Sequence, residues 1–323
     1  MKIVVLDGYT LNPGDLTWDG FGEIGDIVVH DRVSYTLDGQ EQVVEAVGDA
    51  EIVLTNKTPI TREAIESMPK VKYIGVLATG YNVVDIKAAK ERNITVTNIP
   101  TYGTFAVAQM TFALLLEICH HVGIHNEMVH DGFWNRNPDW CFWKYPLIEL
   151  ADKTLGIIGY GRIGRAVGQI GLAMGMKVLV HDQYITDGDT LENVQIVELD
   201  EIFRKSDVIT LHCPLTEHNK GLINKTAIDK MKKSAIIINT SRGPLIVEQD
   251  LADALNSGRI YGAAVDVVSH EPIEADNPLL SAEKCIITPH ISWAPKESRE
   301  RLMQAAVENL VKYLEGNPVN VIN

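Results

Sequence analysis

Residues 154–164, which read TLGIIGYGRIG, decide the fold class of this chain. An apolar run is followed directly by Gly159, Gly161 and Gly164, and the next segment has the apolar spacing of a helix. Gly159 permits a tight turn, Gly161 lets a ligand approach the backbone, and Gly164 allows the helix to pack closely on the strand. A strand, a glycine-rich turn and a helix in this order are typical of a parallel α/β sheet with a phosphate site at the helix N-terminus.

Asp182 stands at the end of the next predicted strand, 18 residues after Gly164. A carboxylate in this place accepts hydrogen bonds from a pair of ribose hydroxyls, so the glycines and Asp182 together indicate a dinucleotide site. A carboxylate also repels a 2′-phosphate, and Gln183 and Tyr184 supply no cation, so NAD is favoured over NADP. The alternative is that Asp182 only caps the following turn.

Short β-branched runs alternate with helical patterns on both sides of this motif. Helices are expected at 40–47, 83–92, 105–122 and 162–174. This alternation predicts an α/β protein with two doubly wound, Rossmann-like domains, each built on a parallel sheet. The expected strands are 3–6, 27–30, 52–55, 73–77 and 95–98 in the first block, and 154–159, 177–181, 208–212, 235–239, 262–267 and 285–288 in the second.

Composition narrows the class of protein. The length of 323 residues suggests two domains, and 46% apolar residues suffice for a buried core in each. A formal net charge of −14 without any block of Lys and Arg disfavours nucleic acid and membranes as partners. The four cysteines are widely spaced, so we expect reduced thiols in a cytoplasmic protein. No signal peptide or membrane-spanning run is expected.

Three residues suited to acid–base chemistry follow strands of the second block, namely Arg242, Glu271 and His290. Arg242 can hold a carboxylate with two parallel bonds, and His290 can exchange a proton near neutral pH. Glu271 can bond the second imidazole nitrogen and orient the ring. Each residue alone also fits a surface cation, a turn cap or a structural histidine. Together with NAD, the set predicts the reduction of a 2-oxo acid.

These residues also carry a resemblance to a known family. Over its whole length the chain resembles the D-isomer-specific 2-hydroxyacid dehydrogenases. The matching motifs are 159–164 with Asp182, HCPLT at 212–216, NTSRG at 239–243, residues 266–272, and TPHI at 288–291. The resemblance implies Arg242 as the substrate anchor, His290 as the acid and base, and Glu271 as the partner of His290.

The resemblance further implies a discontinuous layout and a cofactor site. Residues 1–99 plus 292–323 would form the substrate domain and residues 100–291 the NAD-binding domain, with the active site in the cleft between them. The family also implies a homodimer. The implied cofactor contacts are Thr104, Gly159, Gly161, Arg162, Ile163, Gly164, Asp182, Cys213, Pro214, Thr240 and Asp266.

Loops of the first block bear on which 2-oxo acid is reduced. In the family, backbone N–H groups of the loop ATGYN at 78–82 meet the substrate carboxylate, which makes Thr79 and Gly80 substrate contacts; an ordinary turn is the alternative. The stretches 54–60 and 290–294 resemble glycerate dehydrogenases, also called hydroxypyruvate reductases, so hydroxypyruvate reduction to D-glycerate is expected. Lys57 could meet a phosphate, so a phosphoglycerate type stays open, as do glyoxylate and D-lactate types. An NAD(H)-sensing co-repressor of the same family, which binds peptides, also stays open.

An aromatic stretch and a group of histidines remain to be interpreted. The aromatic stretch 133–145 is expected to pack in an interface; in some family members a tryptophan of the neighbouring subunit reaches the substrate pocket, and Trp140 or Trp143 would be that residue here. His120, His121 and His125 lie close together, but no third ligand follows at a suitable spacing. We therefore expect no metal site.

Overall fold

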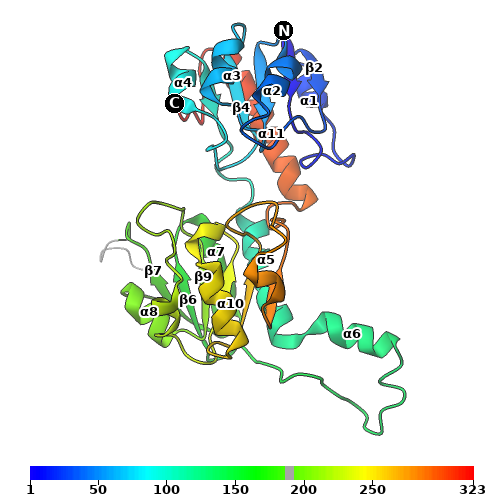
Figure 1. The fold of residues 1–323 in the computed structure, drawn as a ribbon, viewed down its shortest axis with the longest axis vertical. Coiled ribbons are helices and arrows are strands. Elements are labelled where there is room, and N and C mark those ends of the chain that lie inside the picture. The colour runs from blue at the N-terminus through cyan, green and yellow to red at the C-terminus, as the bar shows by residue number, and fades with distance from the viewer. Residues whose placement is uncertain (186–192) are drawn as a thin grey trace. The chain divides into compact units, whose positions relative to one another are not determined.

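A computed structural model describes residues 1–185 and 193–323 of the chain. These residues form two compact units (Figure 1). The split unit consists of Met1–Gly103 and Trp293–Asn323, and the central unit consists of Thr104–Ser292. The chain therefore leaves the split unit near Gly103 and returns to it at Trp293.

The split unit is built on a five-stranded parallel sheet with the order β2-β1-β3-β4-β5. The order reverses at β1, which has β2 on one side and β3 on the other. In doubly wound sheets, ligands bind at the carboxyl ends of the strands beside such a reversal. The strands are β1 (Lys2–Val5), β2 (Asp26–Val29), β3 (Ile52–Thr55), β4 (Tyr73–Val76) and β5 (Thr95–Thr97).

Helices cover both faces of this sheet because its strand side chains alternate between two apolar clusters. Val4 and Val53 belong to the cluster on one face, and Ile3 and Ile52 belong to the cluster on the other. The first cluster includes α2 (Gln40–Val47), α3 (Arg62–Ser67) and α4 (Ile86–Glu91), and the second includes α1 (Asp19–Gly22) and α11 (Lys296–Leu314).

A buried arginine anchors α11, the helix that returns from the second half of the chain. Arg299 is only 7% exposed, and its guanidinium donates to both carboxylate oxygens of Asp15, at 2.7 and 2.6 Å. It also donates to the carbonyl oxygens of Leu11 and Ala294. The guanidinium lowers the pKa of the Asp15 carboxyl through these hydrogen bonds. The ion pair therefore ties the C-terminal helix to the loop after β1.

The last residues of the chain cover the edge of β5. Val321 forms an antiparallel bridge with Thr97, and the N–H of Ile322 donates to the carbonyl of Val96 at 3.0 Å. The N–H of Asn98 donates to the carbonyl of Asn320. An exposed strand edge is a template for unwanted pairing, so this tail protects the sheet.

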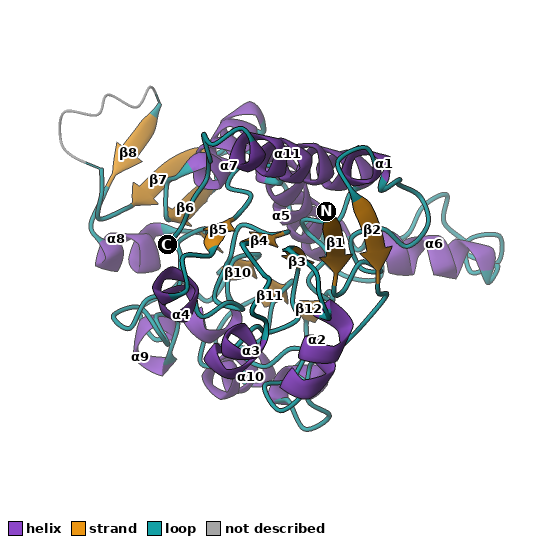
Figure 2. Cartoon of the chain, turned by 90° about the horizontal axis from the view of Figure 1, so that it is seen from above, coloured by secondary structure: helices purple, strands orange, loops and turns teal. Residues whose placement is uncertain are grey.

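The central unit is built on a seven-stranded parallel sheet with the order β12-β11-β10-β9-β6-β7-β8. Figure 2 shows β6, β7 and β8 side by side. The order reverses between β6 and β9, as in the nucleotide-binding sheets of the Rossmann type. The strands are β6 (Thr154–Ile158), β7 (Lys177–His181), β8 (Val194–Ile196), β9 (Val208–Leu211), β10 (Ile236–Asn239), β11 (Gly262–Val265) and β12 (Cys285–Ile287).

Two apolar clusters again hold helices on the two faces. One face packs α5 (Thr104–His120) and α7 (Arg162–Ala173) against residues such as Leu155 and Ile157. The other face packs α8 (Leu199–Lys205), α9 (Lys225–Ile228) and α10 (Glu248–Asn256) against residues such as Ile209 and Ile237. Two short 3₁₀ turns, Gly243–Leu245 and Pro278–Ser281, complete the unit. The two parallel sheets confirm the predicted α/β fold class.

The predicted long helix at 105–122 is divided in the structure. α5 ends at His120, His121 has a left-handed backbone with φ of 50°, and α6 (Val122–His130) follows at a bend of 56°. The Glu117 carboxylate accepts from the N–H of Gly123 at the start of α6. α6 buries none of its described side chains, and it extends away from the rest of the central unit (Figure 1). Apolar periodicity alone did not reveal this break.

The strand predictions agree with the structure to within two residues at each end, with one addition. β8 was missed, because it is short, lies at the sheet edge and has little burial. As for membrane crossing, within residues 1–185 and 193–323 no single helix is long and apolar enough; α5 and α6 reach the required length and apolarity only when counted together across their bend.

Candidate active site

The glycine turn after β6 has the geometry that its sequence predicts. Gly159 has a φ of +93°, and a Cβ there would lie 2.5 Å from the backbone N of Cys213. A Cβ on Gly164 would lie 2.1 Å from the carbonyl oxygen of Gly159. A Cβ on Gly161 would meet no described atom within 4 Å. Two glycines are therefore required by packing, and the third borders open space.

That open space lies at the N-terminus of α7. Gly161 is the N-cap residue, and no side chain of the described residues caps the helix there. Arg162 is the first residue of α7, and Ile163 packs partly into the apolar cluster behind it. A helix N-terminus presents N–H groups and a positive dipole, which suit a phosphate.

Asp182 follows β7 and lies beside the glycine turn. Its Oδ2 accepts from the N–H of Tyr160 at 2.7 Å, and its Oδ1 accepts from the N–H of Tyr184 at 2.9 Å. Each carboxylate oxygen has two lone pairs, so both oxygens can accept a further hydrogen bond. The carboxylate is therefore fixed next to the turn with capacity left for a ribose. The same contact with Tyr184 also satisfies the alternative of a turn cap.

Arg242 is carried on a rigid loop after β10. The Asn239 side chain accepts from the N–H of Ser241 at 3.0 Å and donates to the carbonyl of Arg242 at 2.9 Å. Gly243 is buried, and a Cβ on it would lie 1.9 Å from the backbone carbon of Val268. This close approach holds the loop after β10 against the loop after β11. Arg242 itself is exposed, with Nη1 donating to the carbonyl of Ser241.

His290 and Glu271 are joined by a direct hydrogen bond. His290 Nδ1 lies 2.7 Å from Glu271 Oε2, and the two side chains are 26% and 35% exposed. Because Glu271 takes Nδ1, the ring keeps Nε2 for another partner. His290 has a φ of +54°, a conformation that non-glycine residues rarely adopt.

Asp266 holds the backbone that carries His290. Its carbonyl accepts from the N–H of His290 at 2.8 Å. Its fully buried carboxylate accepts from Thr288 Oγ1, from the N–H of Ile291, and from both the N–H and the hydroxyl of Ser292. These four bonds occupy the four lone-pair positions of a carboxylate. A cofactor contact from Asp266 would therefore have to share a lone pair with one of them.

The other predicted cofactor residues lie on neighbouring elements of the central unit. The Cys213 carbonyl accepts from Ser241 Oγ at 2.6 Å, and burial raises the pKa of the Cys213 thiol to about 11. Pro214 follows directly, and its carbonyl accepts from the Asn219 amide. Thr240 is buried, with its hydroxyl 3.2 Å from that of Thr111. Thr104 is the first residue of α5 and is partly exposed.

The predicted substrate residues belong to the split unit. Lys57 lies in the loop after β3, and its backbone N–H donates to Asp7. Thr79 and Gly80 lie in the loop after β4. Thr79 Oγ1 donates to the carbonyl of Ile99 at 2.7 Å, and the Thr79 carbonyl accepts from the Asn98 amide at 2.8 Å. Both loops follow the carboxyl ends of adjacent strands.

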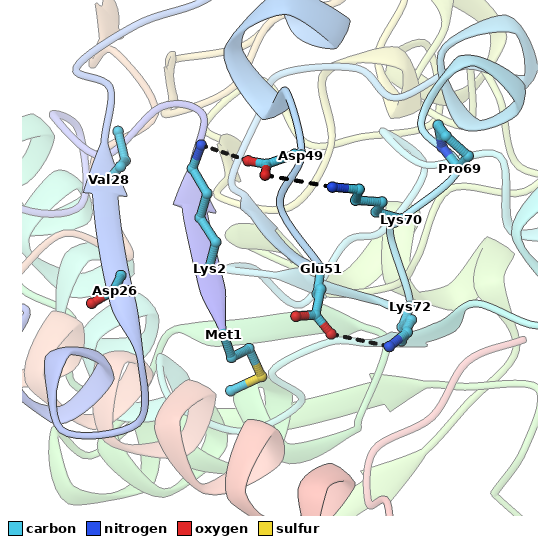
Figure 3. Close-up of a pocket in the computed structure, with 9 residues that line it drawn as sticks. All are labelled: Met1, Lys2, Asp26, Val28, Asp49, Glu51, Pro69, Lys70 and Lys72. Carbon is cyan, nitrogen blue, oxygen red and sulfur yellow. Dashed lines mark hydrogen bonds and ion pairs between the residues drawn. The ribbon is translucent and has the colours of Figure 1, made fainter.

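A hollow of about 840 Å³ lies at the opposite edge of the same sheet, where β1 to β4 begin (Figure 3). Its lysines are matched by carboxylates: Asp49 pairs with Lys2 and Lys70, and Glu51 pairs with Lys72 at 3.0 Å. Ligands of parallel sheets bind at the carboxyl ends of strands, whereas this hollow lies at the amino ends. We therefore assign it no part in catalysis.

The histidines near the end of α5 have structural contacts. His125 Nδ1 lies 2.8 Å from the carbonyl of His121, and His125 Nε2 accepts from the N–H of Lys144. The His121 ring lies 4.9 Å from the ring of Tyr145. Within the described residues, no group of three metal-ligating side chains is found.

One buried polar residue near the predicted loops was missed by the sequence analysis. Asp7 is fully buried, and its carboxylate accepts from the N–H groups of Asn56, Lys57 and Thr58. The signal was present: a charged residue stands two positions after a buried strand. Only the fold reveals that its partners lie 49 to 51 residues away.

Comparison with known proteins agrees with this geometry. Residues 112–292 match the D-isomer specific 2-hydroxyacid dehydrogenase, NAD binding domain. Hydroxypyruvate reductase of Blautia hydrogenotrophica is 62% identical over 323 residues, which are 100% of both chains. Glycerate dehydrogenase of Methylorubrum extorquens is 40% identical over 87% of this chain and 88% of that protein. The apo structure of D-lactate dehydrogenase from Escherichia coli superposes with a TM-score of 0.85 at 28% identity, covering 100% of both chains. The chain belongs to the D-isomer-specific 2-hydroxyacid dehydrogenase family and is an NAD-dependent oxidoreductase.

Proposed function

We propose that this enzyme reduces hydroxypyruvate to D-glycerate with NADH. The proposal for the type of reaction rests on the 2.7 Å hydrogen bond between His290 and Glu271. This pair and the glycine turn follow the carboxyl ends of strands of the same sheet. The full-length similarity to a hydroxypyruvate reductase supports the choice of substrate. Glycerate dehydrogenase, the name of a second relative, describes the same pair of compounds.

The residues of the central unit fit NAD. The open space at Gly161 leaves room for a pyrophosphate against the N-terminus of α7, and Asp182 retains lone pairs for a ribose. Of the implied contacts, Arg162 begins α7 and Thr104 begins α5, while Cys213 and Thr240 lie in the loops after β9 and β10. When bound, NADH supplies the hydride that reduces C2 of the oxo acid.

Arg242 of the central unit would bind the substrate carboxylate. The guanidinium of Arg242 offers parallel N–H donors, and its loop is fixed by Asn239 and Gly243. Within the split unit, the family resemblance supports the backbone N–H groups of Thr79 and Gly80 and the Lys57 ammonium as further contacts of the substrate carboxylate. Fixing the carboxylate orients C2 and its carbonyl oxygen for the reaction.

His290 would deliver the proton. In the reduction, Nε2 of His290 gives its proton to the carbonyl oxygen of the oxo acid while C2 gains the hydride, so the product is the 2-hydroxy acid. Glu271 holds Nδ1, keeps the ring oriented and stabilises the charged imidazolium before the transfer. The reverse reaction returns the proton to the same nitrogen.

We assign the split unit to substrate binding and the central unit to NAD binding. The matched NAD-binding profile lies within the central unit, which supports the second assignment. The unit boundaries, at Gly103 and Ser292, lie within a few residues of those expected from the family resemblance. We also propose a cytoplasmic location, since all four cysteines are unpaired thiols.

We further propose that the enzyme is a homodimer paired through α6 and the aromatic segment after it. Trp140 is 87% exposed, Trp143 64% and Trp134 50%, which is unusual for tryptophan in a single chain. An exposed aromatic surface of this kind is typical of subunit contacts. Light scattering of the purified enzyme should give twice the chain mass, and the double variant Trp140→Ala, Trp143→Ala should shift it toward the monomer. A monomeric wild type would refute the pairing.

The test of the main proposal is a substrate panel. NADH oxidation should be followed with hydroxypyruvate, glyoxylate, pyruvate and 3-phosphohydroxypyruvate, and repeated with NADPH. We expect the highest kcat/KM for hydroxypyruvate with NADH. A preference of tenfold or more for another oxo acid would replace the proposed substrate, and turnover of none of them would remove the proposed reaction.

A further inference from the structure

The Asp7 carboxylate accepts hydrogen bonds from a loop that lies 49 to 51 residues further along the chain. Asp7 follows β1, is fully buried, and accepts three hydrogen bonds from one loop: Oδ1 from the N–H of Asn56 at 2.7 Å, and Oδ2 from those of Lys57 at 2.5 Å and Thr58 at 2.8 Å. Three consecutive N–H groups that converge on one point form an anion-binding nest. Here an internal carboxylate fills that nest, so the loop after β3 is folded around Asp7.

The backbone that presents Asp7 is itself held in place. The N–H of Leu6 donates to the carbonyl of Leu54, and the N–H of Gly8 donates to the carbonyl of His30, each at 2.9 Å. A Cβ on Gly8 would lie 2.6 Å from Val29 Cγ1. These bonds fix the backbone of Asp7 between β2 and β3. The loop whose N–H groups bind the Asp7 carboxylate is therefore held in place as well.

The bonds continue from the first loop to the second. The Asn56 side chain donates to the carbonyl of Leu77 at 2.8 Å, and Leu77 immediately precedes the 78–80 loop. At the end of β3, Thr55 Oγ1 donates to the carbonyl of Thr58 at 2.8 Å. A single line of buried hydrogen bonds thus runs from Asp7 through 55–58 to the loop that contains Thr79 and Gly80.

We propose that Asp7 is a positioning residue for the substrate: it sets the backbone of both loops that bind the 2-oxo acid, without touching the acid itself. The inference rests on the proposed function, in which Lys57, Thr79 and Gly80 bind the substrate carboxylate. The Asp7 side chain is fully buried and both of its oxygens accept from the loop, so it presents no exposed atom to the substrate. Burial raises the pKa of Asp7, and the three N–H donors oppose that rise.

The variant Asp7→Asn tests this inference. An amide in place of the carboxylate keeps the size but turns one acceptor into a donor, so at least one of the three loop N–H groups loses its partner. We expect the KM for the 2-oxo acid to rise about tenfold or more. We expect kcat within about threefold of wild type and the dissociation constant for NADH, measured by fluorescence titration, within about twofold.

A matched control separates positioning from general loss of stability. Asp15→Asn also removes the charge of a carboxylate in the split unit, and it breaks the ion pair with Arg299. We expect Asp15→Asn to lower the melting temperature and to leave the KM for the oxo acid unchanged. Equal changes of KM in both variants would mean that Asp7 acts only through stability, which overturns the inference.

The remaining outcomes also decide the question. If Asp7→Asn yields no folded protein, Asn56→Ala takes its place, because it breaks the next bond of the same line; an unchanged KM in that variant overturns the inference. A wild-type kcat with an unchanged KM in folded Asp7→Asn refutes the positioning role of Asp7 and leaves the proposed function standing. A wild-type enzyme that turns over no 2-oxo acid refutes the proposed function and this inference together.

Discussion

The carboxyl edges of the two sheets use backbone N–H groups in opposite ways. In the split unit, three loop N–H groups converge on Asp7, a carboxylate of the protein itself. In the central unit, the N-terminus of α7 faces open space at Gly161, and in the part of the chain that the structure describes no side chain caps it. One edge is satisfied internally, and the other presents donors to an external anion.

The two units have similar folds, and this difference in how their N–H groups are used corresponds to different proposed tasks, substrate positioning and NAD binding. A doubly wound sheet always gathers loop and helix N–H groups at its carboxyl edge. Where a buried carboxylate fills them, the loops become rigid supports for side chains and neighbouring N–H groups. Where glycine leaves them open, the backbone N–H groups are available to bind a ligand, as proposed for NAD. The predictions below test this division, in order of decreasing expected effect.

The largest effect should come from the histidine of the central edge. We expect His290→Ala to lower kcat by a factor of about 100 or more, because proton delivery to the substrate oxygen is lost. NADH affinity should stay nearly intact, since the glycine turn and Asp182 are untouched. Steady-state kinetics and a fluorescence titration with NADH measure the two quantities.

Two further variants show whether the effect is specific to His290. His270 lies on the same loop as Glu271, is well exposed and pairs only loosely with Glu274 at 3.8 Å, so His270→Ala should retain wild-type kcat. Glu271→Gln keeps a bond to Nδ1 without the charge and should lower kcat less than His290→Ala does. Near-normal turnover in His290→Ala would contradict the assigned role.

Substitutions at two glycines of the turn should affect different properties: at Gly164 the stability of the fold, and at Gly161 the binding of NADH. Gly164→Ala places a Cβ against the carbonyl of Gly159 and should destabilise the fold by about 2–3 kcal/mol. Gly161→Ala, with φ of −71° and no described neighbour, should leave the melting temperature unchanged and weaken NADH binding about tenfold. Urea denaturation and NADH titration of both variants measure this. Unaltered NADH binding in Gly161→Ala would mean that the open space is not the phosphate site.

Cofactor choice should depend on Asp182. Removing the carboxylate in Asp182→Ala should lower kcat/KM for NADH about tenfold and erase most of the advantage of NADH over NADPH, because the repulsion of a 2′-phosphate disappears. Kinetics with both cofactors at fixed hydroxypyruvate measure the ratio. An unchanged ratio would leave Asp182 as a turn cap for Tyr184 and nothing more.

A smaller effect concerns stability and pH. Burial lowers the pKa of His212, beside the glycine turn, from 6.5 to about 3. Below pH 6.5 the unfolded chain therefore binds a proton that the folded chain does not, so stability falls as the pH falls from 6.5 toward 3. The free energy of unfolding should drop by about 1–2 kcal/mol more between pH 7.5 and 5.0 in wild type than in His212→Gln. Parallel loss in both proteins would show that His212 is solvated.

Much of the fold was predictable because its signals are local. Short, almost continuously buried apolar runs in the strands, the spacing of the glycines and the acidic residue after β7 are all readable along the chain. The break at His121 was not, because apolar residues continue through it and the left-handed turn depends on how the following segment departs. β8 was missed because an edge strand of three residues carries little pattern of its own.

The candidate site also combines features that the sequence predicts with features that only the fold reveals. Arg242, Glu271 and His290 were found from strand ends and motif, and the structure adds the 2.7 Å bond between the last two. The bonds of Asp266 to the segment that carries His290 were not predictable, since they join residues 22 to 26 positions apart. Asp7 was missed for the same reason.

The sequence by itself determined the fold class, the glycine motif and the chemical types of the candidate catalytic residues, because glycine, aspartate, arginine and histidine have fixed capabilities wherever they stand. Tertiary structure alone decided which N–H groups stay open and which are filled. Asp7 and Asp182 are both acids after a buried strand, yet one is sealed under its own loop and the other keeps lone pairs beside the glycine turn. That distinction depends on which distant backbone reaches each carboxylate, and the order of the strands in the sheet fixes it.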